Sequence, residues 1–381
     1  MVALDDTRAK HTGRKIYGVK YGRDPMGPHF HVNFVRSNRF LQLSMACPTR
    51  GRAARMVPVD FVHAPTPDRP SAKATELQMA QYRRQRKDCR IGVVAIDRLL
   101  RLRRQLDGEG HAQRPLWVVG DGGYTNDSVL RHLPERTVFT GRIRRDAKLF
   151  QLPQANPRGR RRIYGDPLPT PEQIRQDDGT PWRQVVAYAA GKEHLFRVKT
   201  LDAVRWKSAG DRTLRLIVIA PLAYRLSAGY PLLYRQPGYL VCTDPQAPLE
   251  EVLQAYLWRW DIEVNFRDEK SLLGIDEAKV RDRESVETVP ALGVAAYGLM
   301  LLAGLEVAAE GRQPNTLPLP KWRANRPRPL CAGQLIAALR HELWRGGMRK
   351  THFASPPTSG MKPPKRNPSL ESAVLYAIHS G

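Results

Sequence analysis

The chain has 381 residues, which is enough for two domains or one elaborated domain. Its 62 Lys and Arg residues outnumber its 37 Asp and Glu residues. The resulting formal net charge of +25 excludes an acidic surface and favours a polyanionic partner. Hydrophobic residues make up 41% of the chain, so a large core is available and wholesale disorder is excluded.

In the first half of the chain, short apolar stretches bounded by Gly, Pro and Asn predict strands. A helical pattern follows, and then a continuous apolar strand that ends in Gly120-Asp121-Gly122-Gly123. The expected strands are 15–21, 29–36, 40–46, 116–119 and 137–143, and the expected helix is 75–106. The Arg-rich part of this helix, 83–104, indicates a solvated or DNA-facing surface.

Residues 150–182 are rich in proline and predict an irregular segment, with a basic run from Arg158 to Arg162. This run is either a solvated loop or an arm that contacts phosphates. We expect deletion of 150–180 to leave a folded core. The later pattern predicts strands at 185–189, 195–200, 214–220 and 239–242, and helices at 249–273, 292–309 and 334–344.

The four cysteines are far apart and form no CxxC pair, so neither a zinc ribbon nor a disulfide framework is expected. The first ten residues carry charges and do not resemble a signal peptide. The apolar run 289–305 has 17 residues interrupted by Pro290 and three glycines. It predicts a buried helix rather than a membrane span. These features together predict a cytoplasmic protein without a membrane partner.

The most informative pattern lies in the helix expected at 249–273. At about 100° per residue, Tyr256, Arg259, Glu263 and Lys270 share a stripe roughly 60° wide. One interpretation is an ordinary ladder of helix salt bridges. The other is a catalytic site in which the carboxylate binds a metal ion while the cations and the phenol bind phosphate oxygens.

The spacing Tyr-x2-Arg-x3-Glu-x6-Lys resembles the YREK signature of DDE-class insertion-sequence transposases, and all four residues match. The resemblance extends from Asp5 to about Ala309. It implies an α/β fold of the ribonuclease-H-like class, a mixed sheet flanked by helices. A β-rich insertion would separate the second Asp from the catalytic Glu. The implied parts are a core at 1–149 and 238–310, a basic loop and β-rich insertion at 150–237, and a Pro/Arg-rich region with one helix at 311–381.

The resemblance also implies the site. Glu263 would be the last member of an Asp-Asp-Glu triad whose second member is Asp121. The first is expected directly before a Thr, which favours Asp6 over Asp5 in the sequence Asp5-Asp6-Thr7. Asp6, Asp121 and Glu263 would be the catalytic residues and would hold two Mg²⁺ or Mn²⁺ ions, while Tyr256, Arg259 and Lys270 would bind DNA phosphates.

The implied function is metal-dependent cleavage and strand transfer of an insertion sequence. The partners would be double-stranded transposon ends and target DNA, and a homodimer could form on the DNA. The protein would act in the cytoplasm, at the nucleoid. Two alternatives stay open. The family usually has an N-terminal region ahead of the first Asp, and this chain starts five residues before Asp6. The chain could therefore be an inactive DNA-binding relic, or a plain metal-dependent nuclease.

Weaker features receive simpler interpretations. Asp244 follows an apolar stretch and rivals Asp121, but Pro245 comes next and favours a turn or helix cap. His29 and His31 alternate as on one strand face, where packing is the simpler role. Trp258 and Trp260 are expected mainly in the core.

Overall fold

The structure is a computed structural model. It describes residues 1–350 except 14, 25–26, 29, 50–51, 155–161, 228 and 311–330. The chain divides into two compact units. The first contains Met1–Val264 and Val280–Glu287, and the second contains Asn265–Lys279 and the chain from Thr288 onward. Most of the basic run expected at Arg158–Arg162, and the Pro/Arg-rich segments 311–330 and 351–381, lie outside the described residues.

Eleven strands of the first unit form one mixed sheet. They are β1 (Val2–Lys10), β2 (Lys20–Arg23), β3 (Phe34–Pro48), β4 (Ala54–His63), β5 (Leu116–Gly120), β6 (Thr137–Arg142), β7 (Leu149–Phe150), β8 (Arg183–Ala189), β9 (Lys192–Trp206), β10 (Leu214–Ile219) and β13 (Gly238–Cys242). A small separate hairpin joins β11 (Ala223–Tyr224) to β12 (Leu233–Tyr234).

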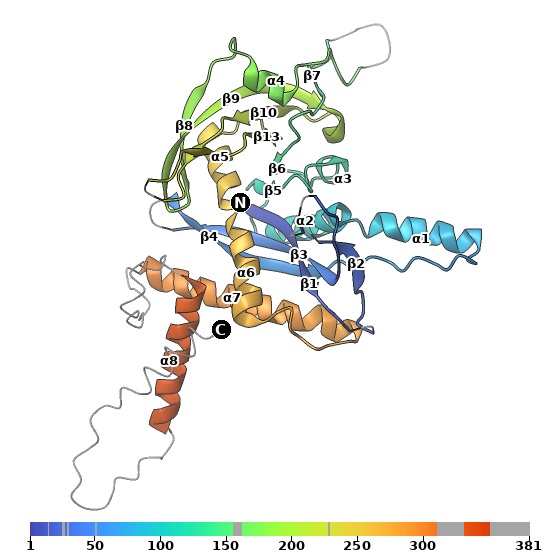
Figure 1. Ribbon diagram of the computed structural model, residues 1–381, viewed down its shortest axis with the longest axis vertical. Helices are drawn as coiled ribbons and strands as arrows, with labels where there is room; N and C mark the ends of the chain where they lie inside the picture. The colour runs from blue at the N-terminus through green and yellow to red at the C-terminus, as the bar shows by residue number, and fades with distance from the viewer. Residues whose placement is uncertain are drawn as a thin grey trace, which may run out of the picture. The chain divides into compact units, whose positions relative to one another are not determined.

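The helices are α1 (Glu76–Asp88), α2 (Ile91–Gly108), α3 (Asp127–Leu130), α4 (Pro171–Gln176), α5 (Leu249–Trp258), α6 (Asp261–Leu273), α7 (Arg283–Ala309) and α8 (Ala332–Lys350). The helix expected at 75–106 is interrupted at Cys89–Arg90. Its first part, α1, buries no side chain, and Figure 1 shows it projecting from the sheet. A capping box closes its N-terminus, where Thr75 and Gln78 bond each other's backbone.

The centre of the sheet has strand order β4-β3-β1-β5-β6. β1, β3 and β4 are antiparallel neighbours, whereas β1, β5 and β6 run parallel. Helices cover both faces. Leu99 of α2 packs in the same core cluster as Leu4 and Val118, whereas Leu253 of α5 packs with Leu240 on the other face. This mixed sheet flanked by helices confirms the expected ribonuclease-H-like fold class.

The N-terminal half differs from the expected strands. The two strands expected at 29–36 and 40–46 are one continuous strand, β3, in which Ser37 and Asn38 are buried. β4 was not expected, and it contains Pro58, a residue that disfavours the middle of a sheet. The structure accommodates Pro58 where the β3–β4 register shifts between Leu43 and Ser44.

The segment 150–182 was expected to be irregular, and the structure adds one helix to it. It contains α4, which begins with a capping box between Thr170 and Gln173. Ile174 of α4 is only 6% exposed and belongs to the main core cluster. Deletion of 150–180 would remove this side chain and open a cavity, so the deleted chain is expected to be strongly destabilised rather than folded.

Lys199 on β9 fixes α4 to the insertion strands. Its side chain is buried, with 1% exposed. Its Nζ donates to the carbonyls of Ile174, Arg175 and Asp177 at 3.2, 3.1 and 2.6 Å, and lies 4.5 Å from the centre of the Trp182 ring. A cation at the C-terminal end of a helix satisfies its last carbonyls and complements the helix dipole.

In the second unit, the hydroxyl of Tyr297 on α7 donates to Asn265 at 3.3 Å and to Asp268 at 3.4 Å. α7 is longer than the helix expected at 292–309 and contains Pro290. By length and composition alone α7 could cross a membrane: the mean hydropathy is 1.8 over its most apolar window, of which 28% is buried. Core helices of soluble proteins meet the same criterion.

Replacing the buried Lys199 tests its structural role. Lys199→Met should lower the free energy of unfolding by about 3 kcal/mol, because buried carbonyls lose their donor. The exposed Lys192→Met on the same strand is the control and should change stability by less than about 0.5 kcal/mol. Urea denaturation followed by tryptophan fluorescence measures both. Equal stability of the two variants would contradict the role assigned to Lys199.

Candidate active site

Asp5 and Asp6 lie on opposite faces of the central sheet, because successive side chains of a strand alternate. Asp6 faces the core that contains α2. Its carboxylate accepts two hydrogen bonds from Arg39, at 2.6 and 2.8 Å, and one from the Tyr124 hydroxyl at 2.9 Å. Burial raises the pKa of Tyr124, and the nearby carboxylates of Asp6 and Asp5 raise it further. Asp6 is thus held by a bidentate ion pair and a buried phenol.

Asp5 points to the other face, toward α5 and α6. Its Oδ2 accepts a hydrogen bond from Arg259 at 3.1 Å, and its Oδ1 accepts one from the backbone N–H of Asp6 at 2.8 Å. Burial raises the pKa of Asp5 to about 7; the Arg259 charge opposes this shift, and the negative charge of Asp121 adds to it. Asp5 therefore shares a partner with Glu263, whereas the partners of Asp6 are Arg39 and Tyr124.

Asp121 comes directly after β5. Leu4 pairs with Gly120 in the parallel β1–β5 register, so Asp5 and Asp121 follow on adjacent strands. Neighbouring strands are about 4.8 Å apart. The Oδ1 of Asp121 accepts the N–H of Gly123 at 2.8 Å, which fixes the turn after the strand.

The three glycines around Asp121 do different things. A Cβ at Gly120 would lie 3.1 Å from both Phe139 and Tyr124, so this glycine serves packing. A Cβ at Gly123 would lie 3.0 Å from the Asp121 carboxylate, so this one keeps the turn tight. At Gly122 the nearest atom, the Arg142 carbonyl oxygen, lies at an ordinary 3.6 Å. Two of the three glycines are therefore explained by local packing.

The helix expected at 249–273 is interrupted, and the single helix is corrected to two. α5 ends at Trp258 and α6 begins at Asp261. At the junction, the backbone N–H groups of Trp260 and Glu263 donate to the backbone carbonyls three residues earlier, at 3.3 and 3.1 Å. These bonds tighten the turn between the two helices. Trp260 is 63% exposed, so the expectation of a core role fails for this side chain.

Contacts with the β3–β4 hairpin hold this junction. The two oxygens of Asp261 accept from the backbone N–H of Met56 at 2.8 Å and from Arg55 at 3.4 Å. The indole of Trp258 donates to the carbonyl of Arg52 at 2.9 Å. These long-range contacts place Arg259 and Glu263 beside β1.

Arg259 is the centre of the site. Only 8% of the residue is exposed, and its guanidinium binds Asp5 at 3.1 Å and Glu263 at 3.2 Å. It also lies 5.7 Å from the centre of the Tyr256 ring. Burial raises the pKa of Glu263; Arg259 opposes this shift, and Asp121 adds to it. Asp5, Asp121 and Glu263 therefore interact electrostatically around one guanidinium.

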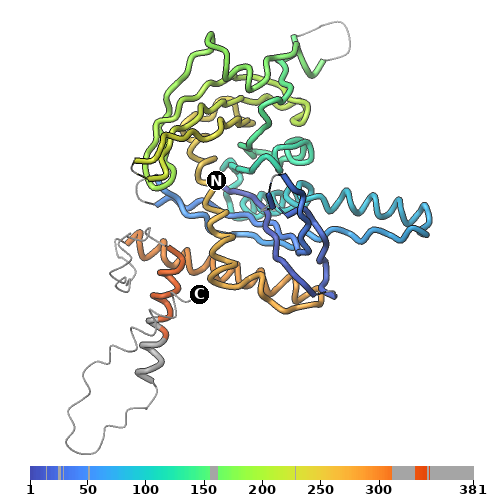
Figure 2. The backbone as a smooth tube through the Cα atoms, in the orientation of Figure 1, coloured from blue at the N-terminus to red at the C-terminus, as the bar shows by residue number. Residues whose placement is uncertain are grey.

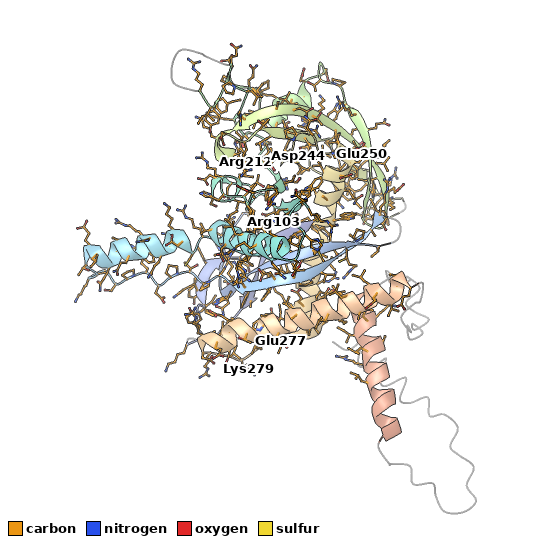
Figure 3. All side chains as sticks on the ribbon, turned by 180° about the vertical axis from the view of Figure 1, so that it is seen from behind. Arg103, Arg212, Asp244, Glu250, Glu277 and Lys279 are labelled. Atoms are coloured by element: carbon orange, nitrogen blue, oxygen red, sulfur yellow. The ribbon has the colours of Figure 1, made fainter. Side chains whose placement is uncertain are left out.

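The other residues expected to bind DNA lie on the same pair of helices. Tyr256 is in the last turn of α5, and burial raises its pKa. Lys270 is in the last turn of α6 and belongs to the second unit. Asp244 lies in the turn between β13 and α5 (Figure 3), where its Oδ1 accepts the N–H of Gln246 at 2.9 Å. This contact identifies Asp244 as a turn residue, and the cap of α5 is Pro248.

Two histidines differ from the sequence-based expectation or lie outside the described residues, and two residues that hold Asp6 were not expected. His31 lies in an exposed bend rather than on a strand, and His29 is outside the described residues. Arg39 and Tyr124, which hold Asp6, were not expected. The sequence carried no signal for them, because their role depends on the β1–β3 register and on the turn after β5.

The donor chemistry of the site suits a hard divalent cation, because Asp5, Asp121 and Glu263 offer only carboxylate oxygens. Within the described part of the chain, no three His, Cys, Asp or Glu side chains already have the geometry of a metal site. Instead, Arg259 compensates two of the three carboxylates. Burial raises the pKa of Asp5 and of Glu263 and the charge of Asp121 adds to both shifts, so a bound cation would favour the ionised form of these carboxyls.

Replacing Arg259 tests its central role. Arg259→Met should lower the free energy of unfolding by about 2–3 kcal/mol, because Asp5 loses a buried partner while the side chain of Glu263, 37% exposed, is partly screened. Urea denaturation in EDTA measures the change. The exposed pair Arg144–Asp146 supplies the control, and Arg144→Met should cost less than about 0.5 kcal/mol. Adding Asp5→Asn to Arg259→Met should recover part of the loss; a further loss instead would contradict this account.

A search of curated proteins finds no match to this chain. The sequence model of one family, described as Transposase DDE domain, matches residues 77–299. This match includes Asp121 and the four residues from Tyr256 to Lys270, and it begins after β1. Because it spans more than half of the 381 residues, the chain belongs to the DDE transposase domain family.

Proposed function

We propose that this transposase-family chain cleaves DNA and transfers the cut strand, moving an insertion sequence with the help of two divalent ions. The observation that carries the proposal is the cluster of Asp5, Asp121 and Glu263 around Arg259. Membership of the family supports DNA as the substrate. The net charge of +25 supports binding of a polyanion.

Asp5, Asp121 and Glu263 would hold two Mg²⁺ or Mn²⁺ ions. When bound, such ions stabilise the attacking and leaving oxygens of an in-line displacement at phosphorus. Asp6 is replaced by Asp5 in this proposal. Asp6 acts instead as a positioning residue, because Arg39 and Tyr124 fix β1 through it and so orient Asp5 on the opposite face.

Arg259 changes partners in this proposal. In the structure its guanidinium neutralises Asp5 and Glu263. With cations on these carboxylates, the guanidinium is free to donate to a DNA phosphate in the bidentate manner that suits it. Tyr256, close to Arg259, would donate its hydroxyl to the same strand, and Lys270 would bind a phosphate as a point charge.

A plain nuclease and an inactive DNA-binding relic are outcomes of the experiments below. We infer that the protein acts in the cytoplasm at the nucleoid, on double-stranded transposon ends and target DNA, with a homodimer as the assembly on DNA. The pairing of β1 supports the proposal that the chain is active. β1 pairs with both β3 and β5, so its two aspartates have fixed positions in the sheet.

Substitution of single carboxylates tests the site. Asp5→Asn and Glu263→Gln should each reduce nicking of supercoiled DNA with Mg²⁺ or Mn²⁺ by on the order of 100-fold or more, since each removes a charge at the reacting phosphate. Asp6→Asn should keep cleavage within about tenfold and mainly reduce stability, because its partners are structural. Near-ultraviolet circular dichroism verifies folding. Loss of cleavage in Asp6→Asn with an active Asp5→Asn would return the ligand role to Asp6.

Cleavage products distinguish the alternatives. Joined products, in which the cut strand is linked to target DNA, support strand transfer. Cleavage without joining would indicate a nuclease. DNA binding without cleavage by the folded wild type would indicate a relic and would refute the proposed activity.

Salt dependence tests DNA binding separately. The logarithm of the DNA affinity should fall linearly with the logarithm of salt concentration, with a slope of about −0.9 per phosphate neutralised. Fluorescence anisotropy between low and physiological salt measures this slope. Asp121→Ala should bind at least as tightly as the wild type, since it removes a negative charge and no phosphate contact. Affinity that does not respond to salt would contradict an electrostatic interface.

A further inference from the structure

The strand pair β2–β3 presents aromatic side chains to solvent. Tyr21 is 74% exposed and Phe34 is 67% exposed. In the antiparallel register Tyr21 pairs with Arg36, and Arg23 pairs with Phe34. Paired residues share a face, so these four residues alternate aromatic and basic on one face of the hairpin. We call Tyr21, Arg23, Phe34 and Arg36 the hairpin face.

This hairpin face lies on the same side of the sheet as Asp5. Asp5 pairs with Gln42 of β3, and the β1–β3 register continues without a shift to Ser37. Residues at even positions of β3 from Phe34 to Gln42 therefore point to one side. Arg36 lies six positions before Gln42 on β3, which corresponds to about 20 Å along the strand. The hairpin face thus lies on the same side of the sheet as Asp5, and the buried side chains of Asn38, Phe40 and Gln42 lie between them.

The surroundings of the hairpin face are positively charged. Arg23 is exposed. Arg36 lines a neighbouring pocket of about 540 Å³ that also takes in two acidic side chains, Asp68 and Asp282. Its five basic side chains are Lys15, Lys20, Arg36, Arg281 and Arg283. Burial lowers the pKa of Lys20, and the charge of Arg36 lowers it further, as expected where cations are crowded. Lys20 pairs with Asp68 and Arg283 pairs with Glu287, so part of this charge is compensated within the protein. The remaining excess of basic over acidic side chains favours a partner that carries phosphates over an apolar one.

We propose that the hairpin face binds single-stranded DNA, with bases stacked on Tyr21 and Phe34 and phosphates bound by Arg23 and the neighbouring cations. This proposal rests on the proposed function, because the occupant is a strand that leads away from the cleaved phosphate. Exposed aromatics within a basic surface are the combination that single-strand binding uses, since every base has a face on which an aromatic ring can stack. Duplex DNA offers its phosphates but hides its base faces in the stack.

The test compares binding of single and double strands. The probes are a fluorescein-labelled (dT)20 strand and a labelled duplex of equal length, measured by anisotropy. Tyr21→Ala/Phe34→Ala should lower the affinity for (dT)20 by roughly tenfold or more and leave the duplex affinity within about twofold. The salt slope should stay unchanged, because no charge is removed. Tyr21→Phe/Phe34→Tyr keeps both rings and should bind like the wild type.

A matched control uses two other exposed aromatics, Tyr230 and Tyr234, which are 53% and 63% exposed. Tyr230→Ala/Tyr234→Ala should leave both affinities unchanged. Equal losses for single and double strands, or no loss, would overturn the proposal. A change in sedimentation of Tyr21→Ala/Phe34→Ala without loss of (dT)20 binding would assign the hairpin face to a second copy of the chain, and would also overturn it.

The result of the (dT)20-binding test can be distinguished from the result of the cleavage test of the proposed function. Glu263→Gln should lose cleavage and keep the preference for (dT)20 that depends on Tyr21 and Phe34. If the wild type binds (dT)20 through the hairpin face but never cleaves DNA, the proposed activity fails and the binding site remains. If the wild type cleaves DNA and Tyr21→Ala/Phe34→Ala binds (dT)20 normally, the proposed single-strand site fails and the proposed activity remains.

Discussion

The site depends on the two ion pairs of one buried guanidinium. Asp5 is largely buried, and burial together with nearby carboxylates favours its protonated form. Arg259 offsets this by donating to Asp5 and Glu263 at once, from a position that is only 8% exposed. Removing one partner from such a set leaves a charge without compensation, so the arrangement constrains every element that contributes to it.

These constraints explain several features of the fold. The parallel pairing of Leu4 with Gly120 brings Asp5 and Asp121 to adjacent positions. The interruption between α5 and α6 brings Arg259 against β1, and the β3–β4 hairpin holds the interruption through Asp261 and Trp258. On the far face, the ion pair between Asp6 and Arg39 keeps β1 from rotating. Each contact is remote in sequence; the pairing with β5 and the ion pair with Arg39 act on β1, and the contacts of Asp261 and Trp258 act on the β3–β4 hairpin.

Much of this could be predicted from the sequence. β5, β10 and β13 are continuous apolar stretches, and the helical stripe from Tyr256 to Lys270 has fixed spacing, so pattern alone located these elements. The choice between Asp5 and Asp6 could not be made in this way. Adjacent aspartates on a strand give no alternation signal, and only the pairing partners decide which one faces α5.

Other features depended on tertiary contacts that no local pattern reports. β3 reads as two strands because Ser37 and Asn38 are polar, yet both are buried within one. The proline in β4 disfavoured a strand that the register shift accommodates. Continuous helical periodicity hid the interruption at Arg259, because the residues on both sides favour a helix. The proline-rich segment 150–182 is a further example. Long-range contacts of Ile174 with the core and of Lys199 with the end of α4 order part of it, and no local pattern reports them.

The pairing of β13 limits how this fold can be recombined. β13 pairs with β6 on one side and with β10 on the other, and a short turn, 243–248, leads from it into α5 along the tube of Figure 2. Strands β8, β9 and β10, which fall in the segment expected to be an insertion, therefore belong to the same sheet as β1 and β5 and cannot be exchanged as a loop. A chimaera carrying the insertion of a relative must keep Cys242 opposite Thr140. A slip of one residue would turn the strand over and start α5 from the wrong face, with Arg259 directed away from Asp5.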